Sequence, residues 1–365
     1  MKFYLPTMVF QEKDAVRNHG EQMAHYGKKA LIVTGRSSSK KNGALQDVID
    51  SLEKFNTSYV VFDKVMENPG VGNIMEAAGL GRREGTDFVI GVGGGSPLDA
   101  AKAIALMIQN RDSTEEVLYQ ARDLRHLPVV AVPTTCGTGS EVTPYAVLTR
   151  DDLQTKQSIS HTIFPALALV DGKYLEKAPL SVLVNTAVDA LAHMLESYFH
   201  ANATDYSRML SQYAMEVWGV AADVLFGTEA SEEDYARLMF ASSLAGMAIS
   251  QTGTSLPHGL SYYLTYHKGV PHGKAVGVFL AGYLDILPEE FEPQVIMALR
   301  TLGFGSIGQF AGLMKELLGS AELTGEEIEA MADGMAGNER KLAAVPFDVD
   351  RGQILKMVKS ACAQP

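Results

Sequence analysis

Short β-branched runs alternate with longer helical patterns through the first half of the chain. Runs typical of buried strands cover 30–34, 58–62, 88–92 and 127–132, and helical patterns cover 42–55, 71–83 and 97–109. This alternation favours a parallel sheet, because the crossover between two parallel strands is usually a helix. Ligands bind such sheets at the carboxyl ends of the strands. The pattern therefore predicts a doubly wound α/β fold with a ligand site at that edge.

From about residue 181 the pattern changes to long segments rich in Ala, Leu and Met. These segments cover 182–199, 208–226, 232–250 and 275–284, and others continue to residue 362. Their apolar residues recur at helical spacing, which predicts an all-helical domain. The stretch 170–179 is the natural boundary. We therefore expect an α/β domain over 1–178 and a helical domain over 179–365.

Length and composition limit the class of protein. The chain has 365 residues, of which 46% are hydrophobic and 20% charged, and its net charge is −12. These values are typical of a folded globular chain of about two domains. An acidic chain without a long basic run is not expected to bind nucleic acid, because that affinity depends on clustered Lys and Arg. We expect a small-molecule partner instead.

The sequence also predicts the compartment. No apolar run approaches the ~20 residues that span a bilayer, so we expect no membrane association. The segment 1–10 has a Pro in its middle and lacks the uninterrupted apolar stretch of an export signal. Two cysteines cannot form a disulfide framework, which fits a reducing compartment. We therefore expect a cytoplasmic protein.

A glycine-rich turn joins a predicted strand to an apolar helix. Residues 88–105 read FVIGVGGGSPLDAAKAIA. Glycine allows positive φ and a close approach of the backbone to an anion, and we expect Ser96 to cap the helix with Pro97 at its first position. The helix N-terminus then offers unpaired N–H groups to a phosphate. The turn predicts a pyrophosphate site, while a plain tight turn is the alternative.

A second polar cluster follows the next predicted strand. Residues 133–143 read PTTCGTGSEVT, with five hydroxyl side chains among small residues. Such hydroxyls can bind sugar and phosphate oxygens at close range, although ordinary polar loops have the same composition. Two such loops after neighbouring strands favour a nucleotide site.

Four residues in the second half have side chains that bind metals. Asp189 and His193 stand at i and i+4 on one face of a predicted helix, which either aims both at one point or forms a helix ion pair. His258 and His272 each stand between a Pro and a Gly, and we expect the small neighbour to leave room for an ion. One carboxylate and three imidazoles suit Fe²⁺ or Zn²⁺ and leave a position for a substrate oxygen. The set predicts a catalytic metal site.

The other histidines carry weaker signals. His267 is the main competitor for the third imidazole position, but beside Lys268 it is more typical of a solvated loop. The histidines without any paired signal are His19, His25, His126, His161 and His200. We expect no metal role for them.

Five motifs together resemble the iron-containing (group III) alcohol dehydrogenases, in order and over nearly the whole chain. The motifs are GGGSPLDAAKAIA, PTTCGTGSEVTPYAVLT, VDALAHMLESY, LPHGLSYYL and GVPHG. The resemblance implies a Rossmann-like dinucleotide-binding domain, a helical domain of the dehydroquinate synthase-like architecture and an active cleft between them. It implies hydride transfer between a nicotinamide cofactor and a small primary alcohol or aldehyde. By the same resemblance Fe²⁺, or Zn²⁺, is bound by Asp189, His193, His258 and His272.

The resemblance also implies cofactor contacts and an oligomer. The pyrophosphate is expected on Gly94, Gly95 and Ser96, and the nicotinamide ribose near Lys156. The residues expected to line the adenosine and nicotinamide sides are Thr134, Thr135, Thr143 and Val147, and Asn68, Asp99 and Thr138 complete the set. A homodimer or higher homo-oligomer is implied, in which a predicted strand over 2–10 could pair across a two-fold axis.

One departure from the family pattern concerns the nucleotide. Many NAD-dependent members have an Asp just after the strand that here ends at Thr34, whereas this chain continues GRSSSKK over 35–41. A carboxylate repels a 2′-phosphate, and Arg, Lys and Ser donors bind it. We therefore expect NADP(H) to be preferred over NAD(H), as in butanol-dehydrogenase-type members, unless this stretch is only a solvated loop. The expected contacts are Gly35, Arg36, Ser37, Ser38 and Lys41.

A second departure is Tyr262, four residues after His258, where many members have another His suggested to relay protons. Its hydroxyl could donate to a water chain, or its ring could be a core aromatic. Rival functions also stay open on this scaffold. A zinc glycerol-dehydrogenase-like polyol oxidoreductase or a lyase would have the same scaffold. A metal-dependent hydrolase would need the metal ligands but not the phosphate turn. A non-catalytic nucleotide-binding protein would need the phosphate turn but not the metal ligands.

Overall fold

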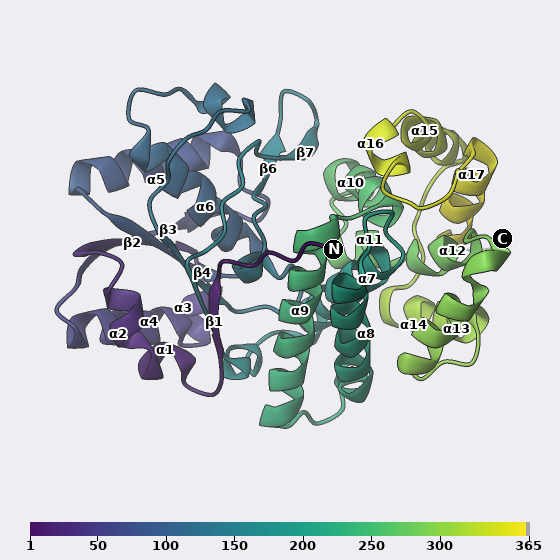
Figure 1. The fold of residues 1–365 in the computed structure, drawn as a ribbon, viewed down its shortest axis with the longest axis horizontal. Helices are drawn as coiled ribbons and strands as arrows, with labels where there is room; N and C mark the ends of the chain where they lie inside the picture. Colours follow the sequence, from purple (N-terminus) through teal and green to yellow (C-terminus); the bar gives the residue numbers. More distant parts are fainter. Residues whose placement is uncertain (363–365) are drawn as a thin grey trace. The chain divides into compact units, whose positions relative to one another are not determined.

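A six-stranded parallel sheet organises the first half of the chain, in the order β1-β8-β5-β4-β2-β3 (Figure 1). Its strands are β1 Met8–Gln11, β2 Lys29–Gly35, β3 Ser58–Val65, β4 Phe88–Gly93, β5 Val129–Pro133 and β8 Leu167–Val170. An antiparallel ribbon of β6 Val147–Arg150 and β7 Thr155–Ser158 follows β5. The structure is a computed structural model that describes residues 1–362. The predicted parallel α/β fold of this half is confirmed.

Alternate residues of each strand pack on opposite faces of the sheet. The helices involved are α1 Ala15–Asn18, α2 Gly20–Ala24, α3 Ser38–Lys41, α4 Ala44–Lys54, α5 Val71–Glu84 and α6 Gly95–Gln109. Leu31 and Val33 of β2 belong to the core shared with α5 and α6, whereas Ala30 and Ile32 belong to the core shared with α1, α2 and α4. Figure 1 shows these two helix layers on opposite sides of the sheet. Both faces are therefore buried, which explains the nearly continuous apolar runs of the strands.

The second half is helical. Its helices are α7 Leu180–Tyr198, α8 Asp205–Val220, α9 Glu232–Thr252, α10 Leu256–Lys268, α11 His272–Gly277, α12 Leu280–Asp285, α13 Glu292–Thr301, α14 Ile307–Leu318, α15 Gly325–Ala336, α16 Glu339–Leu342 and α17 Arg351–Ser360. Among the described residues after 180, extended pairing is limited to one bridge between Ala321 and Cys362. The predicted helical domain is confirmed.

The chain divides into two units. The sheet unit comprises 4–179 and 231–246, and the helical unit comprises 1–3, 180–230 and the residues from 247 onward. The first part of α9 belongs to the sheet unit because two glycines allow close backbone contact. A Cβ at Gly246 would lie 2.7 Å from the Gly139 carbonyl oxygen, and one at Gly172 would lie 2.6 Å from the Ala236 nitrogen.

The start of α6 differs from the sequence prediction. The helix begins at Gly95 with Gly94 as its N-cap, so Ser96 does not cap it and Pro97 is not its first residue. The turn is made one residue earlier than expected, because Gly93 has a φ of +151° that other residues rarely adopt. Ser96 Oγ instead accepts a hydrogen bond from the Asn68 nitrogen at 3.2 Å.

Two predicted helices are interrupted. The segment 208–226 forms α8 and a separate 3₁₀ turn, Ala222–Phe226, and the segment 275–284 falls into α11 and α12. A glycine stands at or next to the end of the first helix in each case, Gly219 in α8 and Gly277 in α11. Glycine is the poorest helix former after proline, so the chain turns there at low cost.

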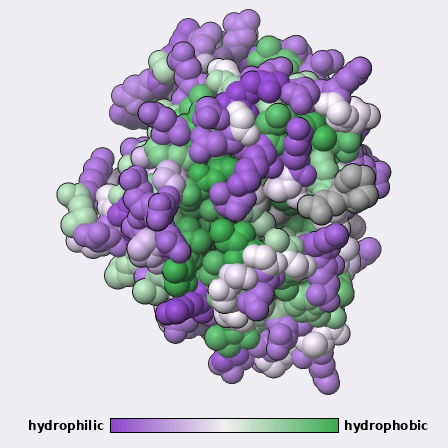
Figure 2. Space-filling model, turned by 90° about the vertical axis from the view of Figure 1, so that its right-hand side faces the viewer, coloured by the Kyte–Doolittle hydropathy of each residue, from purple (hydrophilic) through white to green (hydrophobic). Residues whose placement is uncertain are grey.

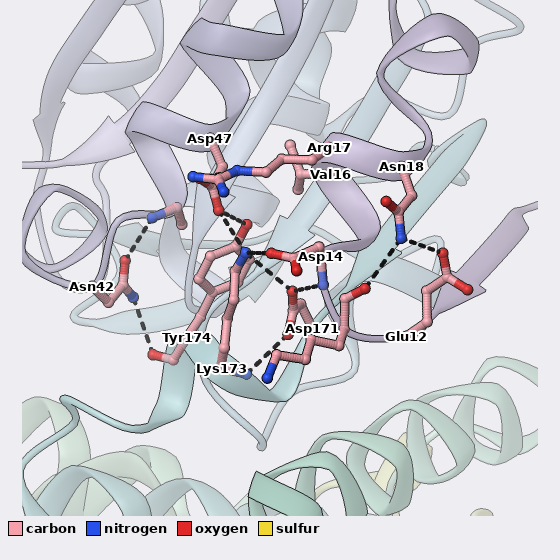
Figure 3. Close-up of polar contacts among 12 residues, drawn as sticks. Glu12, Asp14, Val16, Arg17, Asn18, Asn42, Asp47, Asp171, Lys173 and Tyr174 are labelled. Atoms are coloured by element: carbon pink, nitrogen blue, oxygen red, sulfur yellow. Dashed lines mark hydrogen bonds and ion pairs between the residues drawn. The ribbon is translucent and has the colours of Figure 1, made fainter.

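A partly buried polar network fixes the turn that follows β1 (Figure 3). Asp14 adopts a left-handed conformation with a φ of +60°, and its N–H donates to Asp171 Oδ2 at 2.6 Å. Lys173 Nζ lies 2.8 Å from Asp47 Oδ2 and also pairs with Asp14. Tyr174 donates its hydroxyl to the same Asp47 oxygen at 3.0 Å. The network joins the β1–α1 turn to α4 and to the end of β8.

The surface of the C-terminal helices is mixed in character. Figure 2 shows hydrophobic residues gathered at the centre of this face, with hydrophilic residues around them. Within the part of the chain that the structure describes, no helix combines the length and the apolar character needed to cross a membrane.

Candidate active site

α7 carries two of the predicted metal ligands on one face. Asp189 and His193 stand one helical turn apart and are only 3% and 5% exposed. His193 Nε2 lies 3.9 Å from Asp189 Oδ1. The helix is apolar along most of its length, so its core packing holds these two polar side chains in place.

The other two predicted ligands come from the starts of neighbouring helices. His258 is the third residue of α10 and His272 the first residue of α11. α11 lies against α7 because residue 273 is glycine: a Cβ there would be 1.6 Å from the Asn185 carbonyl oxygen. A Cβ at Gly259 would similarly lie 2.5 Å from Met335 Cε. These glycines permit close helix packing, which differs from the expectation that they leave room for an ion.

The structure places a ring nitrogen of each of the three predicted histidine ligands within 3.9 Å of one oxygen of Asp189. Asp189 Oδ1 lies 3.4 Å from His258 Nε2 and 3.7 Å from His272 Nε2, in addition to its contact with His193. The ligand atoms of Asp189, His258 and His272 all lie within 4.8 Å of one another. Atoms bound at about 2.1 Å to one tetrahedral ion are roughly 3.4 Å apart, so the spacing fits a shared metal.

Two atoms of the cluster show that its polar groups are not satisfied by the protein alone. Asp189 Oδ1 and His258 Nε2 are buried and make no hydrogen bond to any residue in 1–362. Such atoms are rare in folded proteins, because each costs about 1–3 kcal/mol. A divalent cation would satisfy both.

The electrostatics of the cluster favour a cation. Burial opposes the ionised form of Asp189, but the imidazoles of His193, His272 and His258 outweigh burial and hold its pKa well below the usual range. Burial likewise opposes the charged form of His258, yet Glu196 and Asp189 raise its pKa to about 9. Burial also opposes the ionised form of Glu196, but His258 outweighs burial and lowers its pKa, so Asp189 and Glu196 both stay ionised at neutral pH.

Glu196 is a residue of this site that the sequence reasoning missed. It is fully buried on α7 and one of its oxygens pairs with His258 Nδ1. It stands three residues after His193 and seven after Asp189, so it shares their helix face. A third titratable residue at helical spacing from Asp189 and His193, on a helix that is otherwise mostly apolar, was the signal available in the sequence.

The nucleotide residues predicted after β4 and β5 lie against one another in the sheet unit. The two strands end side by side, with Gly93 in register with Pro133. A Cβ at Gly94 would lie 3.0 Å from Thr135 Oγ1, and one at Gly95 would lie 2.5 Å from Thr138 Cγ2. The glycines therefore serve a close contact between the two loops at the carboxyl edge of the sheet.

A buried ion pair joins these loops to the β6–β7 ribbon. Asp99 on α6 accepts a hydrogen bond from Ser140 Oγ at 2.5 Å and another from the Val147 nitrogen at 2.8 Å. Lys102, one turn further, is completely buried and donates to Ser140 Oγ at 2.8 Å and to the Tyr145 carbonyl at 2.7 Å. Burial lowers the pKa of Lys102 to about 8.

The remaining predicted cofactor residues lie around the same edge. Asn68 lies in a turn where its carbonyl accepts from Thr149 Oγ1 at 2.8 Å, and Lys156 stands opposite Thr149 in the ribbon. Thr134 and Thr143 are buried in the loop that follows β5.

The basic stretch after β2 is largely exposed. Arg36, Ser37, Ser38 and Lys41 all face solvent, whereas Lys40 pairs with Asp63 of β3 at 2.5 Å. Gly35 is the last residue of β2.

The structure also places the alternatives. His267 is exposed at the far end of α10 from His258, so among the described residues it is not part of the cluster. The Tyr262 ring stacks on His272, with ring centres 6.3 Å apart and an interplanar angle of 17°.

A doubly wound sheet with a glycine-rich carboxyl edge, together with a buried carboxylate–imidazole cluster in a helical unit, is typical of metal-dependent dehydrogenases. The comparisons name the family. The model for iron-containing alcohol dehydrogenase matches residues 6–172, and the model for the C-terminal region of the Fe-containing alcohol dehydrogenase family matches 183–362. The chain therefore belongs to the iron-containing alcohol dehydrogenase family, whose members are alcohol and aldehyde oxidoreductases.

Individual relatives agree with this assignment. The chain is 30% identical to an NADPH-dependent butanol dehydrogenase from Clostridium saccharobutylicum, over 77% of this chain and 72% of that protein. It is 30% identical to a lactaldehyde reductase from Escherichia coli, over 73% of this chain and 69% of that protein. A crystal structure of an iron-containing alcohol dehydrogenase from Thermotoga maritima is 37% identical over 99% of both chains, with a TM-score of 0.91.

Proposed function

We propose that the chain is an iron-dependent alcohol dehydrogenase or aldehyde reductase that transfers a hydride between NADP(H) and a small primary alcohol or aldehyde. The observation that carries this proposal is the convergence of three imidazole nitrogens on Asp189 Oδ1 at 3.4–3.9 Å. The family membership supports the reaction class, and the glycine-rich edge of the sheet unit supports the nucleotide.

The donor set fits a divalent metal. Asp189 contributes one negative charge and His193, His258 and His272 bind as neutral imidazoles, so the four residues neutralise only half the charge of the ion. When bound, Fe²⁺ or Zn²⁺ supplies Lewis acidity toward the substrate oxygen. The chain's own residues orient that oxygen and exclude water, while the sheet unit holds the nicotinamide that exchanges the hydride.

The nucleotide preference is proposed to be NADP(H). The segment 35–41 contains no carboxylate, and it exposes Arg36, Ser37, Ser38 and Lys41 as donors for a 2′-phosphate. The relative from Clostridium saccharobutylicum is named as NADPH-dependent, which supports this choice.

We also propose that the chain forms a homodimer or a higher homo-oligomer. β1 is the edge strand of the sheet, and its Met8 is 52% exposed. It covers only Met8–Gln11, so residues 2–7 of the predicted strand over 2–10 are not extended into the sheet. An edge strand with exposed apolar side chains is prone to pair with a second copy. Light scattering should find at least two chains per particle, and Met8→Lys should shift the particle toward the monomer.

One assay tests the function. The absorbance of NADPH is followed with butanal before chelation, after chelation and after addition of Fe²⁺ or Zn²⁺. We expect turnover that chelation removes and Fe²⁺ restores, and a larger kcat/KM with NADPH than with NADH. Oxidation of glycerol with NAD⁺ and Zn²⁺ alone would instead indicate the polyol oxidoreductase. Absence of any nicotinamide turnover with a bound metal would indicate a hydrolase or lyase.

A further inference from the structure

Glu196 is a carboxylate that lies completely inside the protein, where water cannot solvate its charge. Its side chain has no exposed surface, and it lies on α7 on the same face as Asp189 and His193. A buried carboxylate is costly unless charged or polar partners satisfy both of its oxygens. Its contacts therefore indicate what it does.

One oxygen of Glu196 caps the start of α10. Glu196 Oε1 accepts from the Ser255 nitrogen at 2.7 Å, from Ser255 Oγ at 3.1 Å and from the His258 nitrogen at 3.4 Å. Ser255 occupies the N-cap position but makes no side-chain cap of its own, and Pro257 has no N–H to offer. The carboxylate of α7 therefore takes the place of the missing cap and fixes where α10 begins.

The other oxygen acts on the imidazole. Glu196 Oε2 pairs with Nδ1 of His258, while Nε2 of the same ring faces Asp189 Oδ1 at 3.4 Å. A ring that donates its proton from Nδ1 presents a lone pair at Nε2, and the opposite tautomer would place a hydrogen between Nε2 and the metal. One side chain thus sets both the position of His258, through the helix start, and its tautomer.

We propose that Glu196 is a positioning residue for the metal: it holds His258 in the Nδ1–H tautomer with Nε2 free to bind Fe²⁺ or Zn²⁺. The inference rests on the proposed function, because it presupposes the metal site. It predicts that removing the Glu196 charge weakens metal binding by about 10–100-fold, the range typical of carboxylates that support a ligating histidine.

The test compares three full-length chains: wild type, Glu196→Gln and Glu216→Gln. Glu216 is an exposed residue of α8, so the control makes the same substitution outside the cluster. Each chain is stripped of metal, and Zn²⁺ and Co²⁺ affinities are measured by competition with a coloured chelator. We expect Glu216→Gln to match wild type, and Glu196→Gln to bind both metals 10–100-fold more weakly with an altered Co²⁺ absorption spectrum. NADPH binding, which belongs to the sheet unit, should be unchanged in both variants.

A second measurement needs no folded variant at position 196. In wild-type chain labelled with ¹⁵N-histidine and loaded with Zn²⁺, the resonance that His258→Gln removes should show an Nδ1–H proton protected from exchange with solvent. Wild-type metal affinity in Glu196→Gln, or an unprotected Nδ1–H in the wild type, overturns the inference and leaves the proposed function standing. A wild-type chain that binds no divalent metal overturns both.

Discussion

The carboxylate–imidazole cluster of the helical unit and the glycine-rich edge of the sheet unit, where we propose that the nucleotide binds, differ in whether their buried polar atoms have partners. In the cluster, Asp189 Oδ1 and His258 Nε2 are buried and make no hydrogen bond to any of the residues that the structure describes. At the nucleotide edge, both oxygens of Asp99 are already engaged, by Ser140 and Val147. The cluster therefore has buried polar atoms that a bound cation would satisfy, whereas the hydrogen bonds of Asp99 at the sheet edge form without any ligand.

The largest effect is expected from a substitution that disrupts the cluster and leaves the sheet unit unchanged. His258→Ala removes one ligand, so we expect bound metal to be lost and kcat/KM to fall by about 10³-fold or more, a loss of several kcal/mol of transition-state stabilisation. NADPH affinity should stay within about twofold of wild type, because the residues that we propose to bind the nucleotide belong to the other unit. Metal content, steady-state kinetics and NADPH fluorescence measure the three quantities. His267→Ala is the matched control and should keep both metal and activity; full activity in His258→Ala would contradict the mechanism.

The next effect concerns the edge in the absence of any ligand. Asp99→Ala leaves the buried Lys102 without its carboxylate, and we expect the free energy of unfolding of the nucleotide-free chain to fall by about 3 kcal/mol. Urea denaturation measures it. Glu76→Ala breaks an exposed pair with Lys64 and should cost less than about 1 kcal/mol. If Asp99→Ala instead kept its stability and lost only NADPH affinity, Asp99 would be a direct cofactor ligand.

The stability deficit of Asp99→Ala should depend on pH. The folded chain holds the Lys102 proton less tightly than the unfolded chain, because burial lowers its pKa to about 8, and loss of Asp99 lowers that pKa further. The deficit is thus complete well below pH 8 and shrinks as the pH rises toward 8, where folded wild type itself releases the proton. Unfolding measured at pH 6 and pH 9 should show the smaller deficit at pH 9. An equal deficit at both values would mean that the charge of Lys102 is not its cause.

A smaller effect concerns the nucleotide preference. Arg36→Ala removes a charged donor after β2, so we expect the ratio of kcat/KM for NADPH to that for NADH to fall by about 10-fold, the equivalent of one charge-assisted hydrogen bond. Arg83→Ala changes an exposed arginine at the end of α5 and should leave the ratio unchanged. An unaltered ratio in Arg36→Ala would mean that the stretch 35–41 is a solvated loop that does not bind the 2′-phosphate.

The smallest effect concerns Tyr262. Its ring stacks on His272, so we expect the ring to hold that imidazole and the hydroxyl to be dispensable. Tyr262→Phe should lower kcat by less than about threefold and leave its pH profile unchanged. A loss of about 100-fold with a shifted profile would assign the hydroxyl to proton transfer.

Local sequence patterns predicted four of the six strands of the sheet, β2, β3, β4 and β5. They missed β8, Leu167–Val170, which is fully buried but only four residues long. In the run 30–34, four apolar residues precede Thr34, and the β-branched residues Ile32 and Val33 favour a strand over a helix. The ribbon strands Val147–Arg150 and Thr155–Ser158 escaped prediction because they are four residues long and partly exposed. The start of α6 was misplaced because the deciding feature, the positive φ of Gly93, is a backbone property that three adjacent glycines do not distinguish.

Sequence spacing predicts which site residues share one helix, but not which helices meet. Asp189 and His193 share a helix face, so their pairing follows from the sequence, whereas their meeting with His258 and His272 depends on how three helices pack. The packing contact at Gly273 that brings α11 to α7 is not visible in the chain alone. The spacing of Glu196 from Asp189 and His193 is visible in the sequence. Its hydrogen bonds to the start of α10 are not, because they depend on how α7 and α10 pack together.

The measurement that tests the central claim most directly is NADPH-dependent reduction of butanal by metal-free chain as Fe²⁺ is added in steps. The cluster provides one site for each chain, so activity should rise from near zero in proportion to the iron and level off at one ion per chain. Full activity in the metal-free chain, or a rise that continues well beyond one ion per chain, would contradict the assignment of Asp189, His193, His258 and His272 as the catalytic metal site.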